Sequence, residues 1–318
     1  MNNDRIQEIL DLMEEARLDY FLISDPQSIA YCTGYYNDPH ERMFVFMISK
    51  HGNHTLFMND LFYLEHDLGV NIVWHKDGQD AIQTIVNEMH FPGRIGIDKN
   101  WASHFLLDLM KKLPNAKFIN ASPCVDLVRM KKDLQEQVLM IESSKINDAV
   151  MEEIIPFIQE GVSEKQLAKK LDELFFNHHS TCYGAIVAFG KNAADPHHEN
   201  DDTLLRKGNC VLIDMGCVYK GYCSDMTRTF FYGGIREDEM KVYEIVKKAN
   251  EAAEAMIKPG VKLSDIDKCA RKVISDEGYG QYFTHRLGHF IGRDVHEYGD
   301  VSLSLIHISE PTRRSYIS

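Results

Sequence analysis

Residues 209–232 constrain the fold more than any other part of the sequence. They read NCVLIDMGCVYKGYCSDMTRTFFY, two apolar, β-branched and aromatic runs that each contain one aspartate, Asp214 and Asp225. Such runs predict paired strands, and a turn at Tyr219 and Lys220 would place the two carboxylates directly opposite each other. Facing carboxylates repel unless one is protonated or a cation lies between them. The stretch therefore predicts a metal site, with two exposed turn aspartates as the alternative.

Length and charge limit the class of protein. At 318 residues the chain can form two domains, since one domain takes about 100 to 200 residues. The 35 basic and 48 acidic side chains give a formal charge of -13, which disfavours non-specific binding to nucleic acid or to an anionic membrane. No segment approaches the roughly 20 apolar residues of a membrane span, and the N-terminus does not read as a signal peptide. We therefore expect no nucleic-acid or membrane partner, and small-molecule or peptide substrates.

The cysteines indicate a reducing compartment. There are seven, an odd number, and none form a CxxC pair. A disulfide framework is not expected from such a pattern in a chain of this length. We therefore expect free thiols and a cytoplasmic protein.

The first third of the chain alternates strand and helix signals. Short apolar runs predict strands at residues 19–24, 43–48, 55–58, 72–74, 94–97 and 117–119. Helical spacing of apolar residues predicts helices at the N-terminus and at residues 81–89 and 102–113. This alternation is typical of a three-layer α/β domain.

A second domain is predicted to begin near the charged segment 130–133. A long helical pattern starts there and runs toward Ile158, with a kink expected at Pro156. Gly161 then closes this helix.

The helix signals that follow occur twice. Ser163 and Gln166 form a capping-box signal for a short helix, and Ser264 with Asp267 is expected to open another after Gly260. Each short helix follows a long one, which suggests an internal duplication. Chance recurrence of common helix signals is the alternative.

Two loops rich in histidine could complete a site. The segment NAADPHHEN follows a strand-like run and presents His197 and His198. The segment THRLGHFIGRDVHEYG holds, among glycines, His285, His289, His296 and Glu297. Because those glycines make a helix doubtful, we do not interpret the first two of these histidines as a helical zinc pair. Surface or hydrogen-bonded histidines are the alternative for both loops.

Together these segments resemble the proline-specific peptidases of the methionine-aminopeptidase-like, pita-bread metallopeptidase family. The pattern VLIDMGCVYKGYCSDMTRTF, preceded by PHH and followed by HRLGHFIGRDVHE, has the order and spacing of that family. The first third, with SDPQSIAYCTGY, is similar to the creatinase-type N-terminal domain of Xaa-Pro dipeptidases and aminopeptidases. The resemblance implies a creatinase-like α/β domain over residues 1–131 and a pita-bread catalytic domain over residues 132–302, α/β and α+β in class, the latter incomplete at its C-terminus.

The resemblance also implies roles for single residues. The metal ligands of the family's dinuclear site correspond to Asp214, Asp225 and His289. Its substrate and transition-state histidines, the expected catalytic residues, correspond to His197 and His296. The expected walls of an apolar pocket for the proline ring are Tyr183 and Val295. Phe290 replaces a glycine that is usual in the family, which leaves the neighbouring ligand in place.

The expected chemistry follows from these ligands. Carboxylate and imidazole together suit Mn²⁺, Co²⁺, Fe²⁺ or Zn²⁺, of which we favour Mn²⁺ or Co²⁺. A hydroxide that bridges two such ions would attack the carbonyl of an Xaa-Pro bond. The resemblance thus implies a homodimeric dipeptidase or aminopeptidase that cleaves proline-containing dipeptides or short peptides. A non-catalytic pita-bread binding module and a metal-free amidinohydrolase of the creatinase type are the alternatives.

The sequence departs from the family after Val301. The family continues with two segments that each bring a glutamate ligand, whereas this chain continues with LSLIHISEPTR, which looks like a translated sequencing adaptor. We therefore expect residues 303–318 to be foreign, and we do not count Glu310 as a ligand. Activity is expected of the parent enzyme, which has its native continuation, and not of this chain.

Overall fold

The computed structural model of the protein describes residues 1–303. Glu310 and nearly all of the segment expected to be foreign lie outside these residues. The chain divides into two compact units, Met1–Arg129 and the residues from Met130 onward. No helix among the described residues is both long and apolar enough to cross a membrane.

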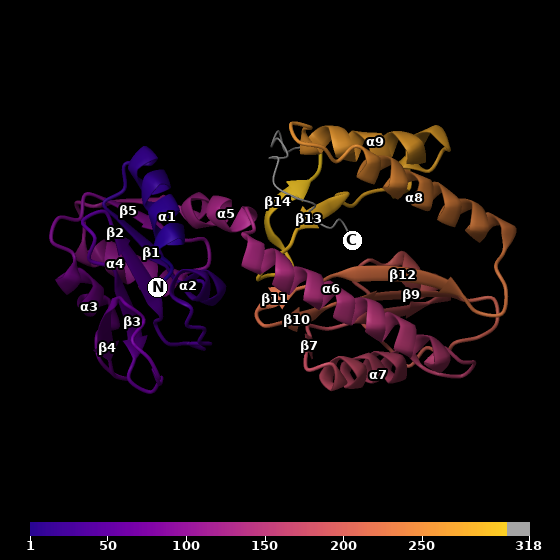
Figure 1. Ribbon diagram of the computed structural model, residues 1–318, viewed down its shortest axis with the longest axis horizontal. Coiled ribbons are helices and arrows are strands. Elements are labelled where there is room, and N and C mark those ends of the chain that lie inside the picture. The colour runs from indigo at the N-terminus through magenta and orange to yellow at the C-terminus, as the bar shows by residue number, and fades with distance from the viewer. Residues whose placement is uncertain (304–318) are drawn as a thin grey trace. The chain divides into compact units, whose positions relative to one another are not determined.

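The first unit is a six-stranded sheet with helices on both faces (Figure 1). The strand order is β4-β3-β2-β1-β5-β6. The bounds are β1 Tyr20–Ile23, β2 Val45–Ser49, β3 Thr55–Asn59, β4 Asn71–His75, β5 Arg94–Ile97 and β6 Lys117–Asn120. Strand β2 pairs antiparallel with β1 and β3, and the other pairs are parallel. All six strands predicted from the sequence are present.

Alternating side chains of this sheet build two cores. Phe21 and Ile23 of β1 pack with apolar residues from α1 (Asn3–Glu15), α2 (Pro26–Thr33) and α5 (Ser122–Met130). Tyr20 and Leu22 pack on the opposite face with residues from α3 (Ala81–Glu88) and α4 (Ser103–Lys112). Successive strand residues point to opposite faces, so one strand serves both cores. The predicted three-layer α/β arrangement is confirmed.

The second unit contains two pairs of helices (Figure 1). The first pair is α6 (Leu134–Ile154) with α7 (Glu164–Asn177), and the second is α8 (Glu237–Ala255) with α9 (Leu263–Asp276). Helix α6 gives way to the 3-10 turn η1 (Ile155–Phe157) at Pro156, which has no amide hydrogen to continue the helix. The predicted break at this proline is therefore present.

The connections inside the two pairs are alike at the glycine. Gly161 and Gly260 have φ angles of 86° and 85°, in the left-handed region that glycine adopts readily. The prediction that Gly161 closes the long helix was wrong, because α6 ends at Ile154 and η1 follows it. Ser163 and Gln166 form the predicted capping box of α7. The second predicted short helix, α9, is present, but the prediction that Ser264 opens it was wrong, because Lys262 is the N-cap and makes no side-chain cap. Ser264 lies inside the first turn of α9 instead.

Short strands carry the loops of the second unit. One sheet has the order β12-β9-β8 and another β11-β10-β7, and within residues 1–303 the strands β13 and β14 form a two-stranded sheet. The bounds are β7 Thr181–Cys182, β8 Ile186–Phe189, β9 Cys210–Met215, β10 Cys217–Tyr219, β11 Tyr222–Cys223, β12 Met226–Phe231, β13 Gly288–Phe290 and β14 Glu297–Val301. Short 3-10 turns η2 (Gly190–Ala194) and η3 (Gly280–Tyr282) lie between them. The main core lies where α6 and α7 pack on β8 and β9.

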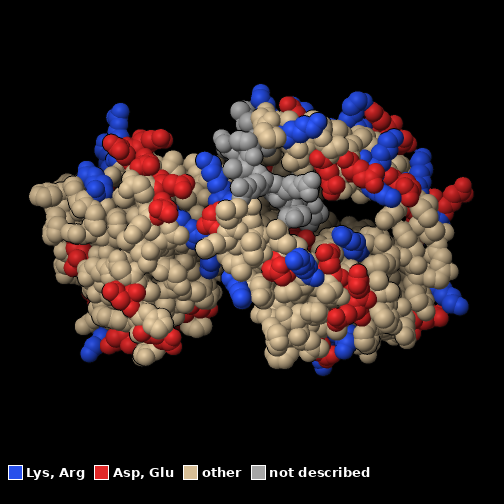
Figure 2. Space-filling model, in the orientation of Figure 1, with Lys and Arg blue, Asp and Glu red and all other residues tan. Residues whose placement is uncertain are grey.

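Charged side chains are intermixed along α8 and α9 (Figure 2). The first turn of α8 holds three acidic residues, Glu237, Asp238 and Glu239. Negative charge is favourable there because the helix dipole is positive at its N-terminus. On α9, Lys272 pairs with Asp276 at 2.6 Å, with both side chains exposed. Because such side chains are exposed, the faces that carry them are solvated, and pairs of this kind contribute little to stability.

Candidate metal centre

The two aspartates lie in a hairpin whose register differs from the prediction. Asp214 pairs with Thr227 and not with Asp225. The turn residues are Lys220 and Gly221, both with positive φ as in a type I′ hairpin, so the turn begins one residue later than predicted. Asp225 therefore precedes the partner of Asp214 by two residues. Asp225 itself lies just before β12, and its charge acts on the Asp214 carboxyl group.

Asp225 contacts a histidine from a distant part of the chain. Its Oδ2 lies 3.3 Å from Nε2 of His289 in β13, and their side chains are only 15% and 13% exposed. The other ring nitrogen of His289, Nδ1, lies 3.2 Å from the carbonyl oxygen of Phe290. A backbone acceptor at Nδ1 favours the tautomer that leaves Nε2 as a metal ligand.

The electrostatics of these side chains suit a bound cation. Burial raises the pKa of Asp214, and the charge of Asp225 raises it further, against a hydrogen bond from the Thr227 hydroxyl at 2.7 Å. Burial lowers the pKa of His289, but the Asp225 carboxylate and the Phe290 carbonyl outweigh it, and the pKa is raised. A positive charge between the carboxylates would relieve the repulsion between Asp225 and Asp214.

Asp214, Asp225 and His289 offer two carboxylates and one imidazole, a donor set that suits divalent metal ions. Among residues 1–303, a different group, Glu164 with His198 and Asp201, has its ligand atoms all within 4.8 Å of one another. The chemistry of the first three residues therefore fits the metal ions expected from the sequence.

His296 lies beside His289. Its ring is perpendicular to that of His289, with the ring centres 4.3 Å apart, and the residue is exposed. Partial burial and the neighbouring His289 lower the pKa of His296. The structure therefore brings together four of the predicted site residues, Asp214, Asp225, His289 and His296.

The two predicted pocket walls have different surroundings. The hydroxyl of Tyr183 donates to the carbonyl oxygen of Ser224 at 2.7 Å, next to Asp225. Burial and the charge of Asp225 raise the pKa of Tyr183. This close approach needs Gly216, where an added Cβ would lie 1.8 Å from the Tyr183 oxygen. Val295 is partly buried and packs on a small cluster that contains Tyr222 and Ile291.

His197 is placed apart from these contacts, on the exposed loop after η2. Its backbone N–H donates to Asp195 at 3.0 Å. The next residue, His198, is the one that reaches a buried group, since its Nε2 lies 2.6 Å from Oε2 of Glu164. Glu164 was not predicted from the sequence, although its position directly after the capping serine of α7 placed it at a helix N-terminus.

Glu164 is an anchor for this loop. Its side chain is completely buried. Its Oε1 accepts from the backbone N–H of Phe189 at 2.8 Å and from the Asn192 side chain at 3.0 Å. Its Oε2 accepts from His198 and from the Asp201 N–H at 3.1 Å. Because both oxygens already have two partners, we interpret the cluster as a structural network and not as a second metal site.

Replacing Glu164 by alanine is expected to lower the free energy of unfolding by about 3 kcal/mol or more, because several buried donors lose their acceptor. Chemical denaturation measures this change. The matched control on the same helix is Glu173→Ala, which breaks an exposed pair with Lys170 and should cost less than about 1 kcal/mol. Equal effects of the two substitutions would contradict the anchoring role.

Comparison with known proteins gives matches along nearly the whole chain. Residues 138–313 match the model of metallopeptidase family M24, and residues 5–131 match the Creatinase/Prolidase N-terminal domain. An uncharacterized peptidase of Staphylococcus aureus is 32% identical over 307 residues, which are 94% of this chain and 86% of that protein.

Two solved structures have the same fold. A dipeptidase from Pyrococcus horikoshii has a TM-score of 0.88 and 34% identity, over 96% of this chain and 87% of its own. A recombinant prolidase from Thermococcus sibiricus has a TM-score of 0.91 and 30% identity, over 98% of this chain and 87% of its own. These matches confirm the predicted fold class, a creatinase-type domain followed by a pita-bread domain.

The M24 match covers more than half of the chain, and it includes the segments that bear Asp214, Asp225, His289 and His296. Membership implies divalent metal ions and peptide substrates. The prediction of a metal-dependent peptidase is thereby confirmed, and the alternative of a non-catalytic binding module is set aside. The chain therefore belongs to metallopeptidase family M24, with a creatinase/prolidase-type N-terminal domain.

Proposed function

We propose that the parent enzyme hydrolyses the Xaa-Pro bond of dipeptides or short peptides. The observation that carries this proposal is the meeting of Asp225 and His289 at 3.3 Å, with Asp214 and His296 beside them. These residues come from separate segments of the chain, and the burial of an acid and an imidazole such as Asp225 and His289 is costly unless they have partners or a function. The likeness to a prolidase supports proline as the residue after the cleaved bond.

Asp214, Asp225 and His289 would hold two divalent ions, for which we favour Mn²⁺ or Co²⁺. When bound, such ions polarise a carbonyl and lower the pKa of a water held between them, so that the water can attack as hydroxide. The Phe290 carbonyl keeps the His289 ring oriented with Nε2 toward Asp225. The Thr227 hydroxyl holds the Asp214 carboxylate in place from the neighbouring strand.

The two remaining histidines would act on the substrate. His296 lies next to His289 and is exposed, so its imidazole can donate a hydrogen bond to the oxygen that becomes negative during attack. His197, exposed on its loop, would stabilise or protonate the same reacting group. Neither role requires a metal-binding contact from these rings.

Recognition of proline would depend on packing. A proline after the cleaved bond supplies no N–H, so the site cannot select it by a hydrogen bond to that nitrogen. Because the Tyr183 hydroxyl is already bonded to Ser224, the Tyr183 ring is the part that can face a substrate. Val295 would supply a second apolar surface.

We further propose, as expected from the sequence, that the parent enzyme is a cytoplasmic homodimer with a domain boundary between residues 131 and 132.

A substrate panel tests the proposal directly. The parent enzyme, supplied with Mn²⁺ or Co²⁺, should cleave Ala-Pro at least about tenfold faster than Ala-Ala, because the apolar pocket favours the ring. Removal of metal by a chelator should abolish both rates, and re-addition should restore them. Equal rates on the two dipeptides would contradict the specificity, and full activity without metal would contradict the role given to the metal ligands. Comparison of Ala-Pro with Ala-Pro-Ala distinguishes a dipeptidase from an aminopeptidase.

A further inference from the structure

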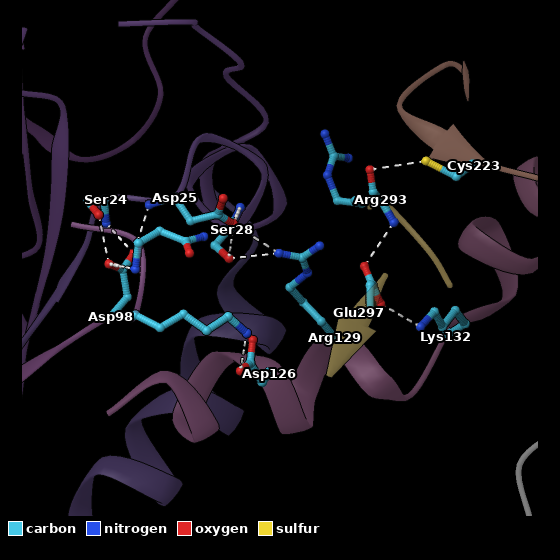
Figure 3. Close-up of polar contacts among 12 residues, drawn as sticks. Ser24, Asp25, Ser28, Asp98, Asp126, Arg129, Lys132, Cys223, Arg293 and Glu297 are labelled. Carbon is cyan, nitrogen blue, oxygen red and sulfur yellow. Dashed lines mark hydrogen bonds and ion pairs between the residues drawn. The ribbon is translucent and has the colours of Figure 1, made fainter. Parts of the chain in front are cut away.

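A buried carboxylate lies directly after His296 in the chain. The Glu297 side chain is 5% exposed and its Oε2 lies 2.8 Å from Nζ of Lys132, which is itself only 12% exposed (Figure 3). Removing two charges from water is unfavourable unless their geometry is good and their remaining hydrogen-bonding groups are satisfied. The buried ion pair therefore restricts the conformation of the segment that contains His296 and Glu297.

The same carboxylate closes the loop between β13 and β14. Its Oε1 accepts from the backbone N–H of Arg293 at 2.9 Å, across the loop from which His296 projects. Gly292 makes room for this contact, since an added Cβ there would lie 2.6 Å from Oε2 of Glu297. Without that glycine, the carboxylate could not keep its place.

The loop is also attached to the strand that leads to Asp225. The backbone N–H of Cys223 in β11 donates to the Gly292 carbonyl oxygen at 2.7 Å. The Cys223 thiol contacts the Arg293 carbonyl oxygen at 3.5 Å (Figure 3). One side of the loop is thus held by β11 and the other by the buried carboxylate, and the His296 ring lies 4.3 Å from that of His289.

We propose that Glu297 is a positioning residue, whose carboxylate, paired with Lys132 and bonded to the Arg293 N–H, fixes the loop that holds the His296 imidazole beside His289. It acts through the backbone of the loop and does not touch the substrate. The inference rests on the proposed function for its catalytic consequence, but the placement of the His296 ring can be measured without activity.

Glu297→Gln is the first variant. It removes the ion pair and leaves the Lys132 ammonium buried without its counter-charge. In the parent enzyme, kcat for Ala-Pro should fall roughly 10- to 100-fold, the usual range for loss of a supporting contact around a metal site. KM and metal content should stay unchanged. A merely structural role would lower the amount of folded enzyme and leave kcat per folded molecule unaltered.

The second variant is Glu297→Gln/Lys132→Met. It removes the uncompensated ammonium, while the glutamine oxygen can still accept from the Arg293 N–H, so kcat should recover most of its loss. Recovery supports positioning. Persistent loss in a folded double variant would overturn it in favour of direct participation of the Glu297 charge, and an unchanged kcat in the single variant would overturn it outright.

A third measurement separates this inference from the proposed function. In the metal-free full chain, the His296 ring signals in a ¹H–¹³C NMR spectrum, assigned by their loss in His296→Ala, should shift or broaden in Glu297→Gln and return in the double variant. Unchanged signals in the single variant would overturn the positioning role. If the parent enzyme did not cleave Xaa-Pro peptides, the proposed function would be wrong, but the NMR result on the position of His296 would remain valid.

Discussion

Asp225→Asn is expected to abolish the metal content and the peptidase activity of the parent enzyme together. The substitution removes the charged oxygen that faces Nε2 of His289 at 3.3 Å and the negative charge that acts on Asp214. A divalent ion stabilises the developing charge of the reaction by several kcal/mol, so the rate should fall about 10³-fold or more. Elemental analysis of the purified variant and an Ala-Pro assay measure the two losses.

A readout on binding alone complements the assay. Added Mn²⁺ should raise the melting temperature of the unmodified protein, since a ligand that binds the native state stabilises it by mass action. The shift should be absent in Asp225→Asn and retained in Asp276→Asn, a control carboxylate on the exposed face of α9. Full activity in a metal-free preparation of the parent enzyme would contradict the assignment of these residues.

The hairpin that carries the two aspartates was predictable in kind but not in register. The apolar, β-branched and aromatic runs predicted the strands, and the turn expected at Tyr219 and Lys220 placed Asp214 opposite Asp225. The register depends on which two residues form the turn, and Lys220 and Gly221 adopt the positive φ angles that a type I′ turn needs. Glycine at the second turn position was the available signal. The pairing shifted by two residues and Asp225 lies in the irregular stretch before β12, where its charge acts on Asp214.

Helix α2 in the first unit was missed although its signals are local. Asp25 caps the helix, Pro26 occupies its first turn and Gly34 ends it with a φ angle of 80°. These are the residue types favoured at those positions. The helix is short and apolar, with little of the periodicity that identifies longer helices.

The two buried carboxylates that support the site could not be predicted from the sequence. Glu164 bonds His198, and Glu297 pairs with Lys132, and both pairs are formed by residues distant in the chain. Neither has a local pattern, because a charge is buried only where tertiary structure supplies its partners. The contact of His198 with Glu164 was not predicted for the same reason. The resemblance assigned the catalytic role to His197, and only the fold shows that His198 bonds Glu164.

The last prediction concerns these adjacent histidines: substitution of one should lower turnover, and substitution of the other should lower stability. His197→Ala should lower the turnover of the parent enzyme by roughly 10²-fold or more, because an imidazole that stabilises or protonates the reacting group is lost. Its melting temperature and metal content should not change, since the His197 side chain is exposed and the contact of this residue with Asp195 is made by the backbone. Ala-Pro turnover at saturating substrate measures the effect.

His198→Ala should instead lower the free energy of unfolding by about 1 to 3 kcal/mol, because the buried Glu164 carboxylate loses a partner at 2.6 Å. Turnover per folded, metal-loaded molecule should fall less than in His197→Ala, since the loop is still held by the Asn192 and Asp201 contacts with Glu164. Wild-type turnover in His197→Ala would show that His197 is an exposed loop residue without a catalytic role. A larger loss of turnover in His198→Ala, at full metal content and unaltered stability, would transfer the proposed role to the neighbour.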